Sequence, residues 1–212
     1  MVKAKIAVLV SGGGTNLQAL IDAQSSGILK SGEIVLVVSG NEDAYALTRA
    51  EKAGIRAEAV PYKKCSSQQE FEAKILELLE EEEIDLIILA GFLNILTENF
   101  TAQYPERILN IHPSLIPSFC GVGYYGLKVH EAALAHEAAL AYGVKVTGAT
   151  VHFVNEVPDG GRILMQKAVA VEEGDTPQTL QRRVMEEAEW VLLPTAAEKV
   201  CRTILENRKD AI

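Results

Sequence analysis

The sequence predicts an α/β fold, a doubly wound and mainly parallel sheet with a Rossmann-like N-terminal half, in a single domain over residues 1–212. Three observations predict it. Short apolar runs alternate with helical spacing along most of the chain. A glycine-rich turn follows the first apolar run and precedes a helical stretch. The 212 residues are 48% hydrophobic, enough for a substantial core, and no linker interrupts them.

Each element follows from a local pattern. Runs rich in Val, Ile and Leu are typical of strands buried on both faces of a sheet, and they predict strands at 6–10, 34–39, 57–60, 84–89 and 108–111. Helical spacing predicts intervening helices at 16–24, 44–53 and 68–83. Two later strands, 147–154 and 163–171, are joined by a loop that carries Asp159. We expect a terminal helical region over 176–207, interrupted at Pro194.

A direct repeat lies between the predicted strands 108–111 and 147–154. Residues 130–135, HEAALA, recur immediately as 136–141. Ala, Leu and Glu favour helix, so we expect the extra copy to extend a helix that begins near Gly126. A looped-out copy is the competing structure, and neither histidine is expected to be catalytic.

Charge and cysteine usage restrict the class of partner. A net charge of −9 disfavours nucleic acid and anionic membranes as partners. No apolar run reaches membrane-spanning length and no signal peptide is expected, so a cytoplasmic enzyme is predicted. The odd, widely separated Cys65, Cys120 and Cys201 fit reduced thiols, and no Cys and His cluster indicates a metal site. The oligomeric state, including a weak homodimer, is left open.

The segment 110–117, NIHPSLIP, together with Asp159-Gly160-Gly161, gathers a carboxamide, an imidazole and a carboxylate. Acyl transfer needs donors for an oxyanion and a base for the proton of the attacking amine. Asn110 and His112 can donate, while Asp159 can orient the imidazole and keep it protonated. Proline after His112 favours extended backbone, so the side chain should leave a strand end in a fixed direction. The alternative is an ordinary hydrogen-bonded histidine.

The glycine-rich turn offers a second site. Residues 11–16, SGGGTN, lie between a strand and a helix, where backbone N–H groups can hold a phosphate. A dinucleotide fingerprint fails, because Leu17 stands where its third glycine belongs. A tight turn without a ligand is the alternative.

These motifs, with Ala90-Gly91-Phe92 between them, occur in the order found in the formyltransferase family, which the chain resembles over essentially its full length. The resemblance implies transfer of a formyl group from the co-substrate 10-formyltetrahydrofolate to the amine of N1-(5-phosphoribosyl)glycinamide in purine synthesis, through a tetrahedral intermediate. Other folate-dependent formyltransferases and formyltetrahydrofolate hydrolase are alternatives, but each usually has an extra domain. A non-catalytic nucleotide-binding module is a further alternative.

The resemblance also implies roles for individual residues. It assigns the nucleotide to Gly14, Thr15, Asn16 and Glu189, the last of these near the glycine amine. It assigns the folate to Asn110, Gln68 and the segment Phe92, Leu93, Asn94, Ile95 and Leu96. Gln68 and Asn94 stand where the family often has arginine, so the resemblance leaves open how the folate glutamate tail is held. His152 is expected to form a structural hydrogen bond, and Cys120 to be a nonessential thiol.

Overall fold

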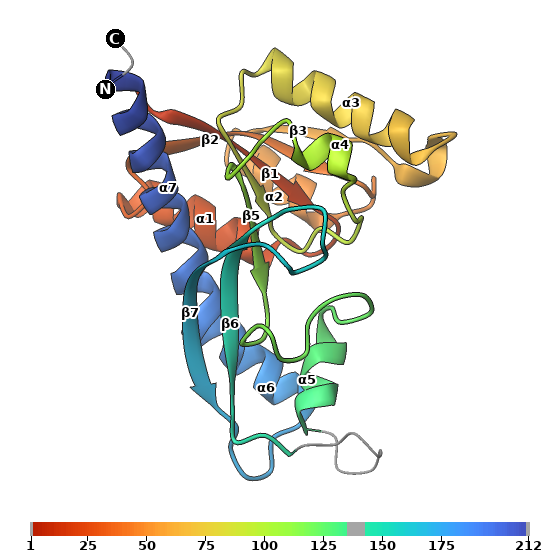
Figure 1. The fold of residues 1–212 in the computed structure, drawn as a ribbon, viewed down its shortest axis with the longest axis vertical. Coiled ribbons are helices and arrows are strands. Elements are labelled where there is room, and N and C mark those ends of the chain that lie inside the picture. The colour runs from red at the N-terminus through yellow and green to blue at the C-terminus, as the bar shows by residue number, and fades with distance from the viewer. Residues whose placement is uncertain (1, 135–142, 211–212) are drawn as a thin grey trace.

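A seven-stranded sheet forms the centre of the computed structural model, which describes residues 2–134 and 143–210 (Figure 1). The strands lie in the order β3-β2-β1-β4-β5-β6-β7. The first five in that order pair in parallel, whereas β6 pairs antiparallel with both β5 and β7. Their bounds are β1 Ala4–Val10, β2 Gly32–Ser39, β3 Arg56–Ala59, β4 Leu86–Leu89, β5 Ile108–His112, β6 Val146–Phe153 and β7 Ile163–Ala170.

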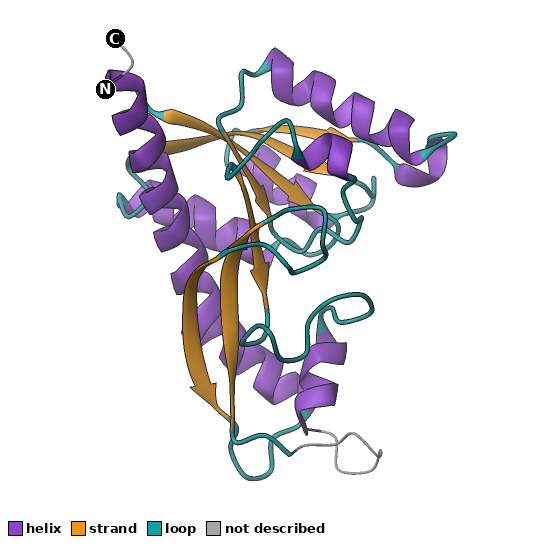
Figure 2. Ribbon diagram, viewed as in Figure 1, coloured by secondary structure: helices purple, strands orange, loops and turns teal. Residues whose placement is uncertain are grey.

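Helices cover both faces of this sheet (Figure 2). They are α1 Thr15–Ser26, α2 Tyr45–Lys52, α3 Gln68–Glu81, α4 Glu98–Thr101, α5 Leu127–Leu134, α6 Pro177–Val184 and α7 Trp190–Asp210, with a 3₁₀ turn at Tyr62–Lys64 and a π-helical turn at Met185–Glu189. The sheet is therefore wound on both sides, as the alternation of apolar runs and helical spacing predicts.

Alternating residues of β1 divide between two cores. Ile6 and Val8 face a cluster that includes residues of α1, α2 and α7, while Ala7 and Leu9 face a cluster built with α3 and α4. All four side chains are fully buried. Because successive side chains of a strand point to opposite faces, burial on both faces explains the continuous apolar run in the sequence.

The predicted fold class is confirmed, and the terminal region holds one correction. Helix α7 continues through Pro194 instead of breaking there. The irregularity lies upstream, in the π-helical turn at Met185–Glu189. Pro194 is the fifth residue of α7, so its missing N–H removes one hydrogen bond from the helix, but the buried apolar residues around it, including Leu193 and Ala197, hold the helix in place. The helix expected near Gly126 is α5, but the second copy of the repeat lies outside the described residues.

Along the described chain, no helix combines the length and apolar character needed to cross a membrane.

Candidate active site

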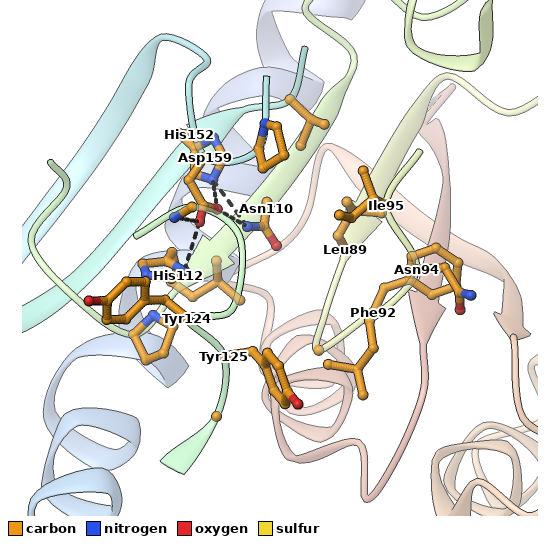
Figure 3. Close-up of a pocket in the computed structure, with 18 of the residues that line it drawn as sticks. Leu89, Phe92, Asn94, Ile95, Asn110, His112, Tyr124, Tyr125, His152 and Asp159 are labelled. Atoms are coloured by element: carbon orange, nitrogen blue, oxygen red, sulfur yellow. Dashed lines mark hydrogen bonds and ion pairs between the residues drawn. The ribbon is translucent and has the colours of Figure 1, made fainter. Parts of the chain in front are cut away.

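The core of the site comes from the register between β5 and β6. Asn110 and His112 are two residues apart on β5, so their side chains point to the same face of the sheet. In the antiparallel pairing, His152 of β6 lies directly opposite Asn110. A cavity of about 540 Å³ opens beside these three residues at the carboxyl end of β5 (Figure 3). Ligands of open α/β sheets bind in this kind of crevice.

Asp159 reaches the same place from the loop between β6 and β7. Its φ of 56° is left-handed, a conformation that aspartate tolerates better than most residues. Gly161 lets the loop fold closely over β6, since a Cβ there would lie 1.7 Å from the Phe153 carbonyl oxygen. Asp159 Oδ2 accepts a hydrogen bond from the Gly121 N–H at 2.8 Å. The loop and the segment after β5 are thereby joined across the site.

The Asp159 carboxylate contacts both histidine rings. Oδ2 lies 3.5 Å from Nδ1 of His112, and Oδ1 lies 3.5 Å from Nε2 of His152. Burial raises the pKa of Asp159, but the contacts with His152, His112 and the Gly121 N–H outweigh it and hold the pKa below its ordinary 3.8. The carboxyl group is therefore ionised at neutral pH and can act as a base.

His112 is buried and fixed at both ring nitrogens. Its Nε2 lies 2.8 Å from the Phe119 carbonyl oxygen, an acceptor, so this nitrogen carries a hydrogen and Nδ1 faces Asp159. That Asp159 keeps the ring protonated during the reaction stays a prediction. Burial lowers the pKa of His112 below 6.5, and the attraction of Asp159 and the bond to Phe119 offset this only in part.

His152 is a site residue that the sequence-based assignment missed. Its Nδ1 lies 2.9 Å from the Phe153 carbonyl oxygen, an acceptor, so this nitrogen carries a hydrogen. Nε2 then accepts from Asn110 Nδ2 at 3.1 Å. The expected structural hydrogen bond therefore exists, but one of its partners is a predicted catalytic group. Nothing in the sequence near His152 signals this contact, because it depends on the register between β5 and β6.

The amide of Asn110 is oriented by these contacts. Its Nδ2 lies 3.1 Å from His152 and 3.5 Å from Asp159 Oδ1, while its oxygen points away from both, toward the side of the cavity with Phe92 (Figure 3). The hydrogen directed at Asp159 is held least tightly. It is the one that Asn110 could donate to a substrate, and the oxygen offers an acceptor.

A second group of polar residues lines another part of the cavity. Gly14, with a left-handed φ of 72°, precedes α1, whose N-terminus has no side-chain cap. Thr15 and Asn16 line the cavity, and Asn16 Nδ2 donates to Glu189 Oε2 at 2.6 Å. Asn16 Oδ1 is buried and has no hydrogen-bond partner within the described part of the chain. An acceptor without a partner is costly when buried, so the bond from Asn16 Nδ2 to Glu189 is made at the expense of the amide oxygen.

Glu189 is buried beside Asn16. Burial raises its pKa from 4.5 to about 7, and the hydrogen bond from Asn16 opposes that shift only in part. The residue ends the π-helical turn, a rare form of helix that is common at functional sites. The cavity thus holds an ionised carboxylate at Asp159 and, at Glu189, one that titrates near neutral pH.

The opposite wall is apolar. The segment 92–96 lines it, with the side chains of Leu93 and Ile95 62% and 59% exposed in the ligand-free protein. Gln68 does not line the cavity. Its Nε2 donates to the Ile95 carbonyl oxygen at 3.0 Å and to Glu72 at 2.7 Å, so it supports the segment from behind.

One cavity therefore brings together most of the residues predicted from the sequence. It is lined by Asn110, His112, Asp159, Thr15, Asn16, Glu189 and all of Phe92, Leu93, Asn94, Ile95 and Leu96. Gly14 and Gln68 are not part of the lining, although each adjoins residues that are. Within the described ranges, no group of three or more His, Cys, Asp or Glu side chains is arranged to hold a metal ion.

The fold and the site together define a doubly wound α/β protein that presents an amide, an imidazole and a carboxylate at the ends of its strands. The chain belongs to the formyl transferase family, whose model matches residues 4–196. A phosphoribosylglycinamide formyltransferase of Haemophilus influenzae is 40% identical over 190 residues, which are 90% of this chain and 84% of that protein.

A solved structure has the same fold. The crystal structure of glycinamide ribonucleotide transformylase 1 from Symbiobacterium toebii superposes with a TM-score of 0.86 at 40% identity, covering 95% of this chain and 89% of that one. The trifunctional purine biosynthetic protein adenosine-3 of Gallus gallus is 46% identical over 198 residues, 93% of this chain. The chain spans only 18% of the length of that relative.

Proposed function

We propose that this protein transfers the formyl group of 10-formyltetrahydrofolate to the amine of N1-(5-phosphoribosyl)glycinamide, a step of purine biosynthesis. One observation carries the proposal: a single cavity joins Asn110, His112 and Asp159 to the polar pair Asn16 and Glu189 and to an apolar wall. A two-substrate transfer requires such an arrangement, because both substrates must meet at the reacting groups.

The two sides of the cavity suit two different substrates. Its apolar wall includes Leu89, Phe92 and Ile95 and lies across from Asn110 and His112, where a flat folate ring fits (Figure 3). The α1 N-terminus, with Thr15, Asn16 and Glu189 lining the cavity beside it, suits a ribosyl phosphate, since backbone N–H groups at a helix N-terminus can bind the phosphate. We therefore place the folate against residues 92–96 and the nucleotide against α1.

In the proposed reaction, a carbon–nitrogen bond forms between the formyl carbon and the amine, and the bond to the folate nitrogen breaks. Asn110 donates the hydrogen that now faces Asp159 to the formyl oxygen as negative charge builds there. His112 stabilises the same negative charge beside Asn110. Negative charge on that oxygen, added to Asp159, raises the pKa of the ring and favours its protonated form in the transition state.

Asp159 moves the remaining proton. Its carboxylate is ionised at neutral pH, so it accepts a proton from the attacking amine and returns one to the departing folate nitrogen, directly or through a water. His152 holds the Asn110 amide while this happens. These groups supply the donor and base functions without a metal or a covalent intermediate.

We place the enzyme in the cytoplasm, because its three cysteines are free thiols, as is usual for proteins of a reducing compartment.

The experiment is a spectrophotometric assay of tetrahydrofolate release from 10-formyltetrahydrofolate, with and without glycinamide ribonucleotide. Release that depends on the nucleotide supports the proposal. Release of tetrahydrofolate without the nucleotide would instead indicate a hydrolase. No release either with or without the nucleotide would leave only a binding module.

Asp159→Asn then tests the assigned base. Removal of a positioned acid/base group lowers rates about a hundredfold or more, so kcat should fall by that factor while nucleotide affinity stays within a few-fold. Glu156→Gln is the matched control, since Glu156 is an exposed acidic residue of the same cavity and is expected to keep near-normal kcat. Near-normal turnover of the Asp159 variant would disprove the assignment.

A further inference from the structure

Helix α2 holds the glycine-rich loop from behind. The backbone N–H of Ala46 donates to the Gly12 carbonyl oxygen at 3.1 Å, and Arg49 Nε donates to the Gly13 carbonyl oxygen at 2.8 Å. Helix and loop are in close contact, because a Cβ at Gly14 would lie 2.7 Å from the Ala46 Cβ. Two successive carbonyl groups of the loop are thus bonded to one helix.

Arg49 itself is fixed on three sides. Besides the bond to Gly13, its Nη1 donates to Gln18 Oε1 at 2.9 Å, and Gln18 in turn donates to Asp22 on α1. The guanidinium group also lies 5.1 Å from the centre of the Tyr45 ring. The half-buried side chain therefore joins α2, the loop and α1, and its position is determined by more than one contact.

Two physical effects follow for a phosphate at α1. The N–H that follows a carbonyl in the same peptide becomes a better donor when the carbonyl is bonded to a cation, so Arg49 strengthens the Gly14 N–H. The bonds also fix the direction of the loop peptides, which reduces the entropy lost when they bind an anion. Such help matters here, because no Lys or Arg is among the described residues that line the cavity.

We propose that Arg49 is a positioning residue for the nucleotide: without touching the substrate, it orients and polarises the Gly12–Gly14 loop that receives the phosphate. The inference rests on the proposed function, which places the nucleotide at this loop. It predicts an effect on nucleotide affinity that does not extend to the folate or to the chemical step.

The test is Arg49→Met, measured by steady-state kinetics with each substrate varied in turn. The nucleotide KM should rise about tenfold or more, the scale for losing a hydrogen bond from a charged group, while kcat and the folate KM stay within about twofold. Arg49→Lys keeps a cation but loses the fork of nitrogens, so it should give an intermediate nucleotide KM. If Arg49→Met folds poorly, Arg49→Lys serves as the test in its place.

Lys52→Met is the matched control. Lys52 lies on the same helix and over the same Tyr45 ring, at 5.8 Å, so its removal changes the charge without any loop contact. Equal nucleotide KM values for Lys52→Met and Arg49→Met would overturn the inference, because they would reduce the effect to overall charge. A wild-type nucleotide KM in both Arg49 variants would overturn it as well.

Failure of the inference is distinguishable from failure of the proposed function. Asn16→Ala removes a cavity-lining contact on the nucleotide side and should raise the nucleotide KM whatever Arg49 does. If Asn16→Ala raises it and the Arg49 variants do not, the inference fails and the proposed function stands. If the wild-type protein shows no nucleotide-dependent release of tetrahydrofolate, both fail.

Discussion

Replacing Glu189 with glutamine should make the stability of the folded protein less dependent on pH. The buried carboxyl has its pKa raised from 4.5 to about 7, so the folded state favours the protonated form. In the unfolded chain the group ionises near its ordinary 4.5. The folded wild-type protein therefore loses stability as pH rises from about 4.5 through about 7, whereas glutamine cannot ionise and avoids this loss.

The size of the effect follows from the two pKa values. The rise from 4.5 to about 7 corresponds to about 3–4 kcal/mol of unfolding free energy, at about 1.4 kcal/mol for each pH unit. Part of this loss has already occurred at pH 5. Between pH 5 and pH 8.5 the free energy of unfolding of Glu189→Gln, relative to wild type, should therefore increase by about 2–3 kcal/mol.

Urea unfolding of the ligand-free protein at constant ionic strength, repeated across this pH range, measures the difference. Glu187→Gln is the control, since Glu187 is exposed in the same π-helical turn, and its stability relative to wild type should change little with pH. Parallel pH curves for Glu189→Gln and wild type would refute the reasoning, because they would mean that burial does not favour the protonated carboxyl.

Two further predictions concern the cavity wall and a nearby thiol. Buried Glu72 of α3 accepts hydrogen bonds from the backbone N–H of Thr97, at 2.8 Å, and from the Thr97 hydroxyl. Glu72→Gln should weaken these bonds and displace the adjoining segment 92–96. The folate KM should then rise several-fold, with little change in the nucleotide KM. The exposed Glu77→Gln on the same helix is its control, and equal effects on both substrates would contradict the assignment. Cys120→Ala should keep near-normal kcat, since Cys120 does not line the cavity and its Sγ bonds the Pro117 carbonyl oxygen; an inactive variant that is folded and binds both substrates would require a covalent route.

The parallel half of the sheet could be predicted because its strands are buried on both faces. The run 6–10 and the run 108–111 correspond to β1 and β5 within two residues at each end, since continuous Val, Ile and Leu leave little choice of structure. The order of the strands in the sheet could not be predicted from local sequence patterns. β4 pairs with β1 across 75 or more residues of chain, and only the packing of the whole sheet determines that pairing.

The site was predictable where spacing along one strand decides it. Asn110 and His112 share a face because they are two residues apart, and the proline after His112 favours the end of the strand. The protonation of His112 was not predictable in this way. Sequence identifies Asp159 as a nearby charge that raises the pKa, but the opposing effect of burial depends on how the segment through Phe119 covers the ring.

Glu189 marks the limit of sequence reasoning at this site, because its position depends on helix register. Glu186, Glu187 and Glu189 offer three carboxylates within four residues, and only the third is buried. A π-helical turn holds about one residue more than an α-helical turn, so it rotates the residues after it by about 100° relative to an unbroken α-helix. Helical periodicity counted from α6 therefore assigns the wrong face to every residue beyond the turn. The resemblance to the family selected Glu189, which does line the cavity, because it compares positions along the chain and does not assume a constant helical pitch; its role beside the amine stays a prediction.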